Sequence, residues 1–314
     1  NCDNNASLST INLNGADSLY SLDLSNNALL PSLDLSANNQ LHTFNCDNNA
    51  SLSYINLNGA DSLFNFSLLN NNLLSSIDVT SNFNLFNFTC TGNSSLTSLD
   101  VSNISMIESV DCSNNNLQSL NLLDCISLKS LDCTNNQINT LDLSTNINLE
   151  SLLCNDNQLE SLPLLDNVNL SDLFCFNNNI EVLNLSNNTT LTNLQCYNNQ
   201  LQVVDLRNGN NINMGYAQYD INLTGNSLLS CVSVDDVAWS VVYWTYPTGN
   251  IDPWTYFSSY CLSYGCTDSL ADNYDSGANT DDGSCIYSSA CLNSSITGLF
   301  ISDIIDNQVL ANFD

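Results

Sequence analysis

Regularly spaced cysteines are the residues of this sequence most able to carry chemistry. Eight of the fourteen occupy the same place in a repeating pattern. A zinc site needs ligands that converge as a tetrahedron, and one cysteine per repeat does not provide that. In-register neighbours also point their Cβ atoms in parallel, which suits a disulfide poorly. We therefore expect buried free thiols that pack as small hydrophobic groups: Cys2, Cys46, Cys90, Cys112, Cys133, Cys154, Cys175 and Cys196.

A catalytic base is hard to assign, because the sequence has one histidine. His42 lies in a series with Tyr20, Phe64 and Phe86 at intervals of 22 residues, which predicts a rung of a ladder. No G-x-S-x-G, phosphate-loop or zinc motif is present. Paired carboxylates could serve a glycosidase, but eight aspartates fall on outward mid-strand positions of the repeats and are predicted to form solvated ladders. We expect no enzymatic activity. These aspartates are Asp23, Asp34, Asp78, Asp100, Asp111, Asp132, Asp142 and Asp205.

The charge balance excludes several classes of partner. The sequence has 32 acidic residues against two basic ones, Lys129 and Arg207, and a net charge of −30. Nucleic acids and anionic membranes are bound through Lys and Arg, so we expect neither partner. No apolar run reaches the length of about 18 residues that a membrane helix needs. The acidic surface favours solubility and cation binding, and the fourteen cysteines favour an oxidising, extracellular setting.

The elements that position these residues form a repeat. The pattern L-x-x-L-x-L-x-x-N recurs up to about residue 212, first in units of 22 residues and later of 21. Within a unit, inward Leu22 and Leu24 alternate with Asp23, as in a strand with one buried face. Asn27 then lies where the chain turns and can hydrogen-bond the backbone of the corner. Both halves of each unit carry the strand pattern, which predicts a solenoid with two parallel sheets and little helix.

The array resembles the leucine-rich-repeat family, in particular the short bacterial type with 21–22-residue units that read LxxLxLxxNxLxxLxCxxN. The resemblance covers residues 1–212, about two thirds of the chain, and implies a mainly β solenoid. Cys125 falls on the corner-asparagine position, where the family also accepts cysteine. The chain begins inside a repeat, so we expect its first coil to need cover from an upstream repeat or another subunit.

Residues 213–262 resemble the C-terminal cap of secreted bacterial leucine-rich-repeat proteins. The cap's N-x-x-L-x-C-I-x-V-D-D-V pattern matches here around Cys231, and its later tryptophan and closing cysteine match Trp244 and Cys261. We expect a Cys231–Cys261 disulfide. The dense aromatic residues of this segment are predicted to cover the apolar end of the array, with a sugar-binding platform as the alternative.

Residues 263–287 resemble a short motif of secreted multidomain bacterial proteins, G-C-T-D-x-x-A-x-N-Y-x-x-x-A-N-x-D-D-G-S-C. We expect a Cys266–Cys285 disulfide. The carboxylates are hard oxygen ligands suited to Ca²⁺, although their spacing is not that of an EF-hand. The alternative is a disulfide-closed module of Asx-rich turns that binds no cofactor. The candidate calcium ligands are Asp268, Asp272, Asp275, Asp281 and Asp282.

Residues 288–314 resemble the first two strands of a fibronectin type III domain, with Gly298-Leu299 opening one strand and residues 309–313 forming the next. A complete domain of this kind needs about 100 residues. We expect the chain to stop inside a domain. Cys291 would pair beyond this chain or stay free.

Outward ladders are the predicted binding surfaces of such a solenoid. The main hypothesis is an extracellular adhesion module that binds a protein or polysaccharide at a cell surface. The alternative is a structural subunit that assembles with copies of itself into a filament or coat. Mutual packing, or cover from a neighbouring domain, would also explain outward apolar residues. The candidate ladders are Tyr20, His42, Phe64 and Phe86, and Leu153, Phe174, Phe176 and Tyr197.

Overall fold

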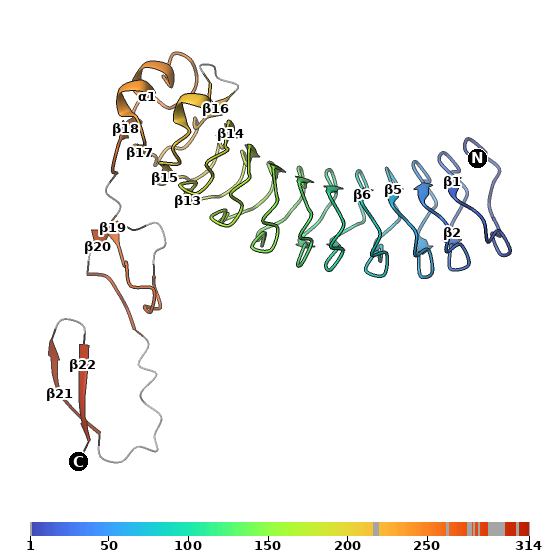
Figure 1. Ribbon diagram of the computed structural model, residues 1–314, viewed down its shortest axis with the longest axis horizontal. Coiled ribbons are helices and arrows are strands. Elements are labelled where there is room, and N and C mark those ends of the chain that lie inside the picture. The colour runs from blue at the N-terminus through green and yellow to red at the C-terminus, as the bar shows by residue number, and fades with distance from the viewer. Residues whose placement is uncertain are drawn as a thin grey trace. The chain divides into compact units, whose positions relative to one another are not determined.

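The computed structural model forms two compact units, residues 1–261 and 262–314. It describes residues 2–215, 220–261, 264–274, 278, 280–281, 283–287, 299–305 and 308–313. Figure 1 shows the first unit as a row of stacked coils that runs from the N-terminus to a C-terminal cap. The predicted mainly β leucine-rich-repeat solenoid is confirmed.

One face of the solenoid is a continuous parallel sheet of ten strands, with one strand from each coil. Each strand pairs without a register shift with the same positions of the next coil, as Leu22 does with Phe44. The sheet therefore places equivalent residues of successive coils side by side (Figure 1). Its strands are β1 (Ser21–Asp23), β3 (Thr43–Asn45), β5 (Asn65–Ser67), β6 (Asn87–Thr89), β8 (Ser109–Asp111), β10 (Ser130–Asp132), β11 (Ser151–Leu153), β12 (Asp172–Phe174), β14 (Asn193–Gln195) and β16 (Ile221–Asn222).

The second face is also parallel, but it is broken into three short sheets. One coil between them carries Pro163 at the mid-strand position, where proline has no N–H for the ladder. The prediction of two strand-bearing faces is thus confirmed, with only one of them continuous. The strands pair as β2 (Ser32–Asp34) with β4 (Tyr54–Asn56), as β7 (Ser98–Asp100) with β9 (Ser119–Asn121), and in the order β13 (Val182–Asn184), β15 (Val203–Leu206), β17 (Cys231–Val234) and β18 (Tyr256–Ser258).

The core is a ladder of inward apolar side chains between the two faces. Phe44, Phe66 and Phe88 stack in successive coils, with neighbouring ring centroids 5.2 Å apart. The ladder cysteines from Cys46 onward are buried, and Leu24 and Leu68 fill the same column where cysteine is missing. Cys2 is exposed, contrary to the expectation of a buried thiol, because in this chain its coil packs against a neighbour on one side only.

A buried asparagine closes the corner that follows each strand of the ten-stranded sheet. In Asn115, the side-chain amide donates to the carbonyls of Cys90 (2.6 Å) and Cys112 (2.8 Å), which lie in two successive coils. Its Oδ1 accepts the backbone N–H of Asn93 at 2.7 Å. The residue before each of these asparagines has positive φ, for example 57° in Asn114, which asparagine tolerates better than most residues. The predicted corner role of asparagine is confirmed.

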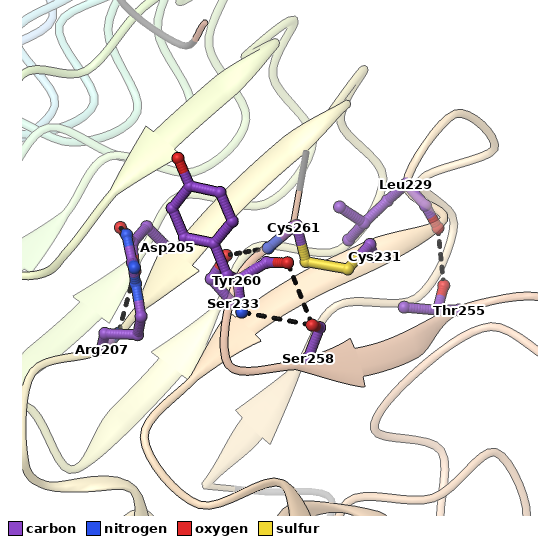
Figure 2. Close-up of a disulfide and its surroundings, with 9 residues drawn as sticks. All are labelled: Asp205, Arg207, Leu229, Cys231, Ser233, Thr255, Ser258, Tyr260 and Cys261. Carbon is purple, nitrogen blue, oxygen red and sulfur yellow. Dashed lines mark hydrogen bonds and ion pairs between the residues drawn. A yellow bond between two sulfur atoms is a disulfide. The ribbon is translucent and has the colours of Figure 1, made fainter. Parts of the chain in front are cut away.

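The cap ends the solenoid with a disulfide and a buried tryptophan. Cys231 in β17 is bonded to Cys261 just after β18, which is one of the two expected pairings (Figure 2). Helix α1 (Val237–Tyr243) leads to Trp244, which is fully buried against the core. Phe257 also packs there, with its ring centroid 5.8 Å from that of Trp244. Other aromatic residues of the segment, such as Trp254 and Tyr256, are exposed, so only some of the aromatic residues cover the apolar end of the array as predicted.

Arg207 lies beside this disulfide and forms one of the chain's two ion pairs among the described residues. Its Nε and one terminal nitrogen donate to the two carboxylate oxygens of Asp205 at 2.9 and 2.6 Å (Figure 2). The guanidinium also lies 5.5 Å from the ring centroid of Tyr260. Arg207 therefore contacts both the last repeat, through Asp205, and the cap, through Tyr260.

The second unit is built from short paired strands. A disulfide joins Cys266 to Cys285, as expected, and β19 (Tyr264–Gly265) pairs in parallel with β20 (Thr280–Asp281). Strands β21 (Leu299–Ile305) and β22 (Gln308–Phe313) pair antiparallel, and a fibronectin type III domain stays a prediction. Cys291 lies outside the described residues. Besides α1, the described residues contain one helical turn, η1 (Asn211–Asn213), and in this part of the chain no helix is long and apolar enough to span a bilayer.

The corner asparagines should dominate stability. Replacing Asn115 by alanine leaves two buried carbonyls and one N–H without their partner, so we expect a loss of about 3 kcal/mol in unfolding free energy. Urea denaturation followed by circular dichroism measures it. The control is Asn139→Ala, an exposed residue in the next coil, which should change stability by less than about 0.5 kcal/mol. Equal effects of the two substitutions would contradict this role of the corner.

Candidate functional site

The first predicted ladder is a stack of aromatic rings that lies just before the strands of the ten-stranded sheet. Ring centroids are 4.9 Å apart for Tyr20 and His42, 4.8 Å for His42 and Phe64, and 4.7 Å for Phe64 and Phe86. The coil spacing of a parallel sheet, about 4.8 Å, is therefore also the stacking distance. Each inner ring has both faces covered by its neighbours, so the ladder presents ring edges to solvent. His42 is a rung, as predicted.

The same column changes character in later coils. Glu108 and Lys129 take the place of the rings and form an ion pair of 3.0 Å between Nζ and Oε2. Both side chains are partly exposed, and such pairs contribute about 1 kcal/mol or less. The aromatic ladder is thus confined to the N-terminal coils.

The second predicted ladder forms one cluster on the outward face of the ten-stranded sheet. Leu153 in β11 pairs in register with Phe174 in β12. Two residues further along each coil, the rings of Phe176 and Tyr197 stack with centroids 4.4 Å apart. Residues two apart in an extended chain point to the same face, which brings the two pairs together. All four side chains are half-buried. We call these residues the aromatic patch.

Carboxylates border the aromatic patch. Asp132 pairs in register with Leu153, and Asp156 accepts the Asn177 amide at 2.7 Å. Burial, and then the negative charge of Asp156, raises the pKa of the Tyr197 phenol above its ordinary value. The hydroxyl therefore keeps its proton at neutral pH and remains a hydrogen-bond donor.

The outward aspartates do more than face solvent. Asp34, Asp78, Asp100 and Asp142 each accept the backbone N–H two residues later at 2.9–3.0 Å, which forms an Asx turn. Donation from the backbone and hydroxyl of Ser144 holds the pKa of Asp142 below its ordinary value. The prediction of solvated ladders missed this role, although the recurrent Asp-x-Ser and Asp-x-Thr pairs could have indicated it.

The ladder thiols are free and, apart from Cys2, buried. Burial raises the pKa of Cys90 to about 12 and that of Cys125 to about 11. Cys125 stands at a corner position, as predicted, and its thiol lies 3.0 Å from the carbonyl oxygen of Val101. The thiols of Cys90 and Cys125 are therefore protonated at neutral pH and are poor nucleophiles.

The structure describes only some of the predicted calcium ligands. Asp268 accepts the N–H of Leu270 and the hydroxyl of Tyr287, and the Asn273 amide bonds to Ser284 and Ile286, so these oxygens already have structural partners. Asp275 and Asp282 lie outside the described residues, and of Asp281 the structure describes only the backbone. Within the described ranges, no group of three or more His, Cys, Asp or Glu side chains could hold a metal ion.

A shallow, open groove elsewhere on the solenoid is polar. Its lining is Glu160, Ser161, Asn179, Glu181 and Gln200. The two glutamates belong to neighbouring coils, and no histidine or cysteine is among the lining residues. This arrangement offers carboxylates and amides to a ligand, without a base and nucleophile in hydrogen-bond contact.

No protein-family model matches the sequence, and no curated protein matches it. Among solved structures, the chain is similar to the functional domain of InlJ from Listeria monocytogenes, which includes a cysteine ladder. The TM-score is 0.55 and the identity 25%, over 76% of this chain and 55% of that chain. The chain therefore spans about half the length of InlJ's solved domain.

Two further solved structures are similar at lower scores. The internalin InlF from L. monocytogenes has a TM-score of 0.40 and 16% identity, over 76% of each chain. The leucine-rich-repeat domain of APL1 has a TM-score of 0.47 and 17% identity, over 84% of this chain and 69% of that chain. The fold is a leucine-rich-repeat solenoid, and like the InlJ domain it contains a cysteine ladder.

Thiol reactivity should separate the classes of cysteine. Among the nine free cysteines that the structure describes, Ellman's reagent at about pH 8 should react with exposed Cys2 in the native protein and leave the eight buried thiols untouched, because the fold shields them from the reagent. In guanidinium those eight should react as well, and the four disulfide-bonded cysteines only after reduction. Fast labelling of Cys154 or Cys175 in the native state, mapped by peptide mass spectrometry, would contradict a closed ladder.

The Asx turns should make stability depend on acid pH. A carboxylate whose pKa is lowered by folding stabilises the fold above its unfolded value of about 4 and loses this as pH falls through the lowered value. We compare melting temperatures of the wild type and Asp142→Asn, whose amide oxygen can accept the same N–H without titrating. As the pH falls from about 5 to about 2, the melting temperature of the wild type should decrease more than that of the variant. A constant difference over that range would contradict the assignment.

Proposed function

We propose that this chain is an extracellular, non-enzymatic adhesion module that binds a protein through the aromatic patch. The observation that carries the proposal is the cluster itself: four neighbouring apolar side chains on the outward face of a sheet whose other coils carry polar residues there, with Leu69 as the exception. Aromatic residues at the centre of a protein interface carry a large share of binding energy.

The patch is suited to binding because it is rigid. Its residues lie in or just after strands of the ten-stranded sheet, and the buried asparagine corners fix each coil to the next. A preformed surface loses little conformational entropy when it binds. The surrounding carboxylates, Asp132 and Asp156, would form the polar rim and select a partner with basic residues.

A protein is a better ligand than a polysaccharide for these ladders. Sugars bind aromatic residues mainly over the ring face, and in the first ladder the faces of His42 and Phe64 are covered by neighbouring rings. In the aromatic patch, Phe176 and Tyr197 cover one face of each other. The other ring faces, the ring edges and the aliphatic Leu153 form a mixed apolar surface, which suits the side chains of a protein.

The extracellular setting is supported by two disulfides and by the acidic surface. Cys231–Cys261 and Cys266–Cys285 persist only in an oxidising compartment. The net charge of −30 keeps a surface-borne module away from nucleic acids and from anionic lipids.

The test is a binding screen of the full chain against extracellular proteins and polysaccharides. The variant Phe174→Thr/Phe176→Ser/Tyr197→Thr places residues found at the same positions of other coils, such as Thr89, Ser113 and Thr134. We expect protein ligands whose dissociation constant rises at least tenfold in this variant. The control Tyr20→Ser changes the other ladder and should bind as the wild type does. Ligands that are polysaccharides only, or equal binding by the variant, would overturn the proposal.

The alternative, a structural subunit of a filament or coat, is tested on the same material. Electron microscopy of the native protein, with and without a chelator, should show dispersed particles if the chain is an adhesion module. Ordered fibres would favour the structural subunit instead. Loss of such fibres on chelation would support a calcium role for the Asp-rich second unit.

A further inference from the structure

A second apolar surface runs along the opposite corner of the solenoid, where the sequence analysis placed no binding residues. Five aliphatic side chains of three successive coils are 42–50% exposed there. In the coils before residue 80, the matching positions carry polar residues such as Asp17, Asn39 and Asp61. We call this surface the aliphatic ridge. Its residues are Leu123, Ile126, Ile147, Leu165 and Val168.

The ridge is contiguous and fixed. Asn148 donates to the carbonyl of Ile126 at 2.8 Å, and Asn169 donates to that of Ile147 at 3.2 Å, so each coil holds the ridge residue of the coil before it. Directly beneath, the buried Asn146 bridges the carbonyls of Leu122 and Cys125. Neighbouring ridge positions therefore keep the coil spacing of about 4.8 Å.

The charges beside the ridge identify the kind of partner. Asp124 and Asp166 are exposed and flank it, each next to a ridge leucine. The chain's two basic residues are paired elsewhere, with Glu108 and Asp205, so these carboxylates have no basic partner within the chain. A second copy would bring a net charge of −30 against the same charge, which disfavours self-association. A partner with basic residues beside apolar ones would be attracted.

The spacing fits a helix that lies along the solenoid axis. Side chains at i and i+4 of a helix are about 5–6 Å apart, close to the coil spacing of the ridge. We propose that the aliphatic ridge docks a basic amphipathic helix of a partner protein, with an apolar stripe on Ile126, Ile147 and Val168 and flanking Lys or Arg beside Asp124 and Asp166. This site is separate from the aromatic patch and does not depend on it.

The experiment uses synthetic helical peptides and the full chain. A Leu/Lys amphipathic peptide is titrated at about 0.15 M salt, where screening already weakens purely electrostatic binding. A Lys/Ser peptide of equal charge lacks the apolar stripe, and a Leu/Glu peptide reverses the charge. We expect binding of the Leu/Lys peptide alone.

Matched variants separate the two contributions. Ile126→Asn/Ile147→Asn/Val168→Thr should weaken the Leu/Lys peptide at least tenfold without changing the charge, and Asp124→Asn/Asp166→Asn should reduce the salt dependence. The control Leu29→Ser/Leu73→Ser removes two leucines of similar exposure at the other corner and should bind as the wild type does, as should the aromatic-patch variant. Unchanged binding by the ridge variant, or equal binding of the Lys/Ser peptide, would overturn the proposal. Circular dichroism checks that each variant is folded.

Discussion

The structure depends on how the buried backbone carbonyls at each corner find a donor. A buried carbonyl without a hydrogen bond costs roughly 1–3 kcal/mol, and every coil has such carbonyls at its corners. The corner asparagine solves this with one side chain, because its NH₂ group reaches the carbonyls of two coils and its oxygen accepts an N–H from a neighbouring coil. Asn136, for example, donates to Cys112 and Cys133, and accepts from Leu117. Coil closure and coil stacking are therefore set by the same group.

The two corners of a coil differ in how many hydrogen bonds the asparagine side chain makes. At the corner with the aliphatic ridge, the amide nitrogens of Asn38, Asn82, Asn146, Asn167 and Asn188 still donate to carbonyls, but their oxygens are buried with no hydrogen-bond partner. That corner also accepts Cys125 and Ala60. The fully bonded corner adjoins the continuous ten-stranded sheet, and the partly bonded one adjoins the face whose strands fall into three sheets. The corner whose asparagine oxygens and amide groups are both hydrogen-bonded is thus the corner beside the continuous ten-stranded sheet.

In-register stacking also decides what a surface can do. Equivalent residues of neighbouring coils lie about 4.8 Å apart, so aromatic rings stack face to face and carboxylates lie beside other carboxylates. In the second face the charge is relieved where asparagine alternates with aspartate, since Asn56 donates to Asp34 at 3.0 Å. The coils stack in the same register along the ten-stranded sheet, while the outward residues differ from coil to coil. Binding surfaces therefore arise where neighbouring coils share an unusual outward residue.

The sequence by itself determined the repeat, the inward leucines and cysteines, the corner asparagines and both disulfide pairings. The repeat, the inward residues and the corner asparagines follow from spacing along the chain, because a solenoid turns short-range periodicity directly into position. The disulfide pairings followed from the resemblance of the cap and of the acidic motif to those of secreted bacterial proteins. Only the tertiary structure decided that the faces of the His42 and Phe64 rings are covered, that Phe174 and Phe176 form one patch with their neighbours, and that Asp142 accepts the backbone N–H of Ser144. It alone gathered Ile126, Ile147 and Val168 into a ridge. Those outcomes depend on exposure and on distances between coils, and side chains with the same sequence spacing can be buried, stacked or open depending on the coil that lies beside them.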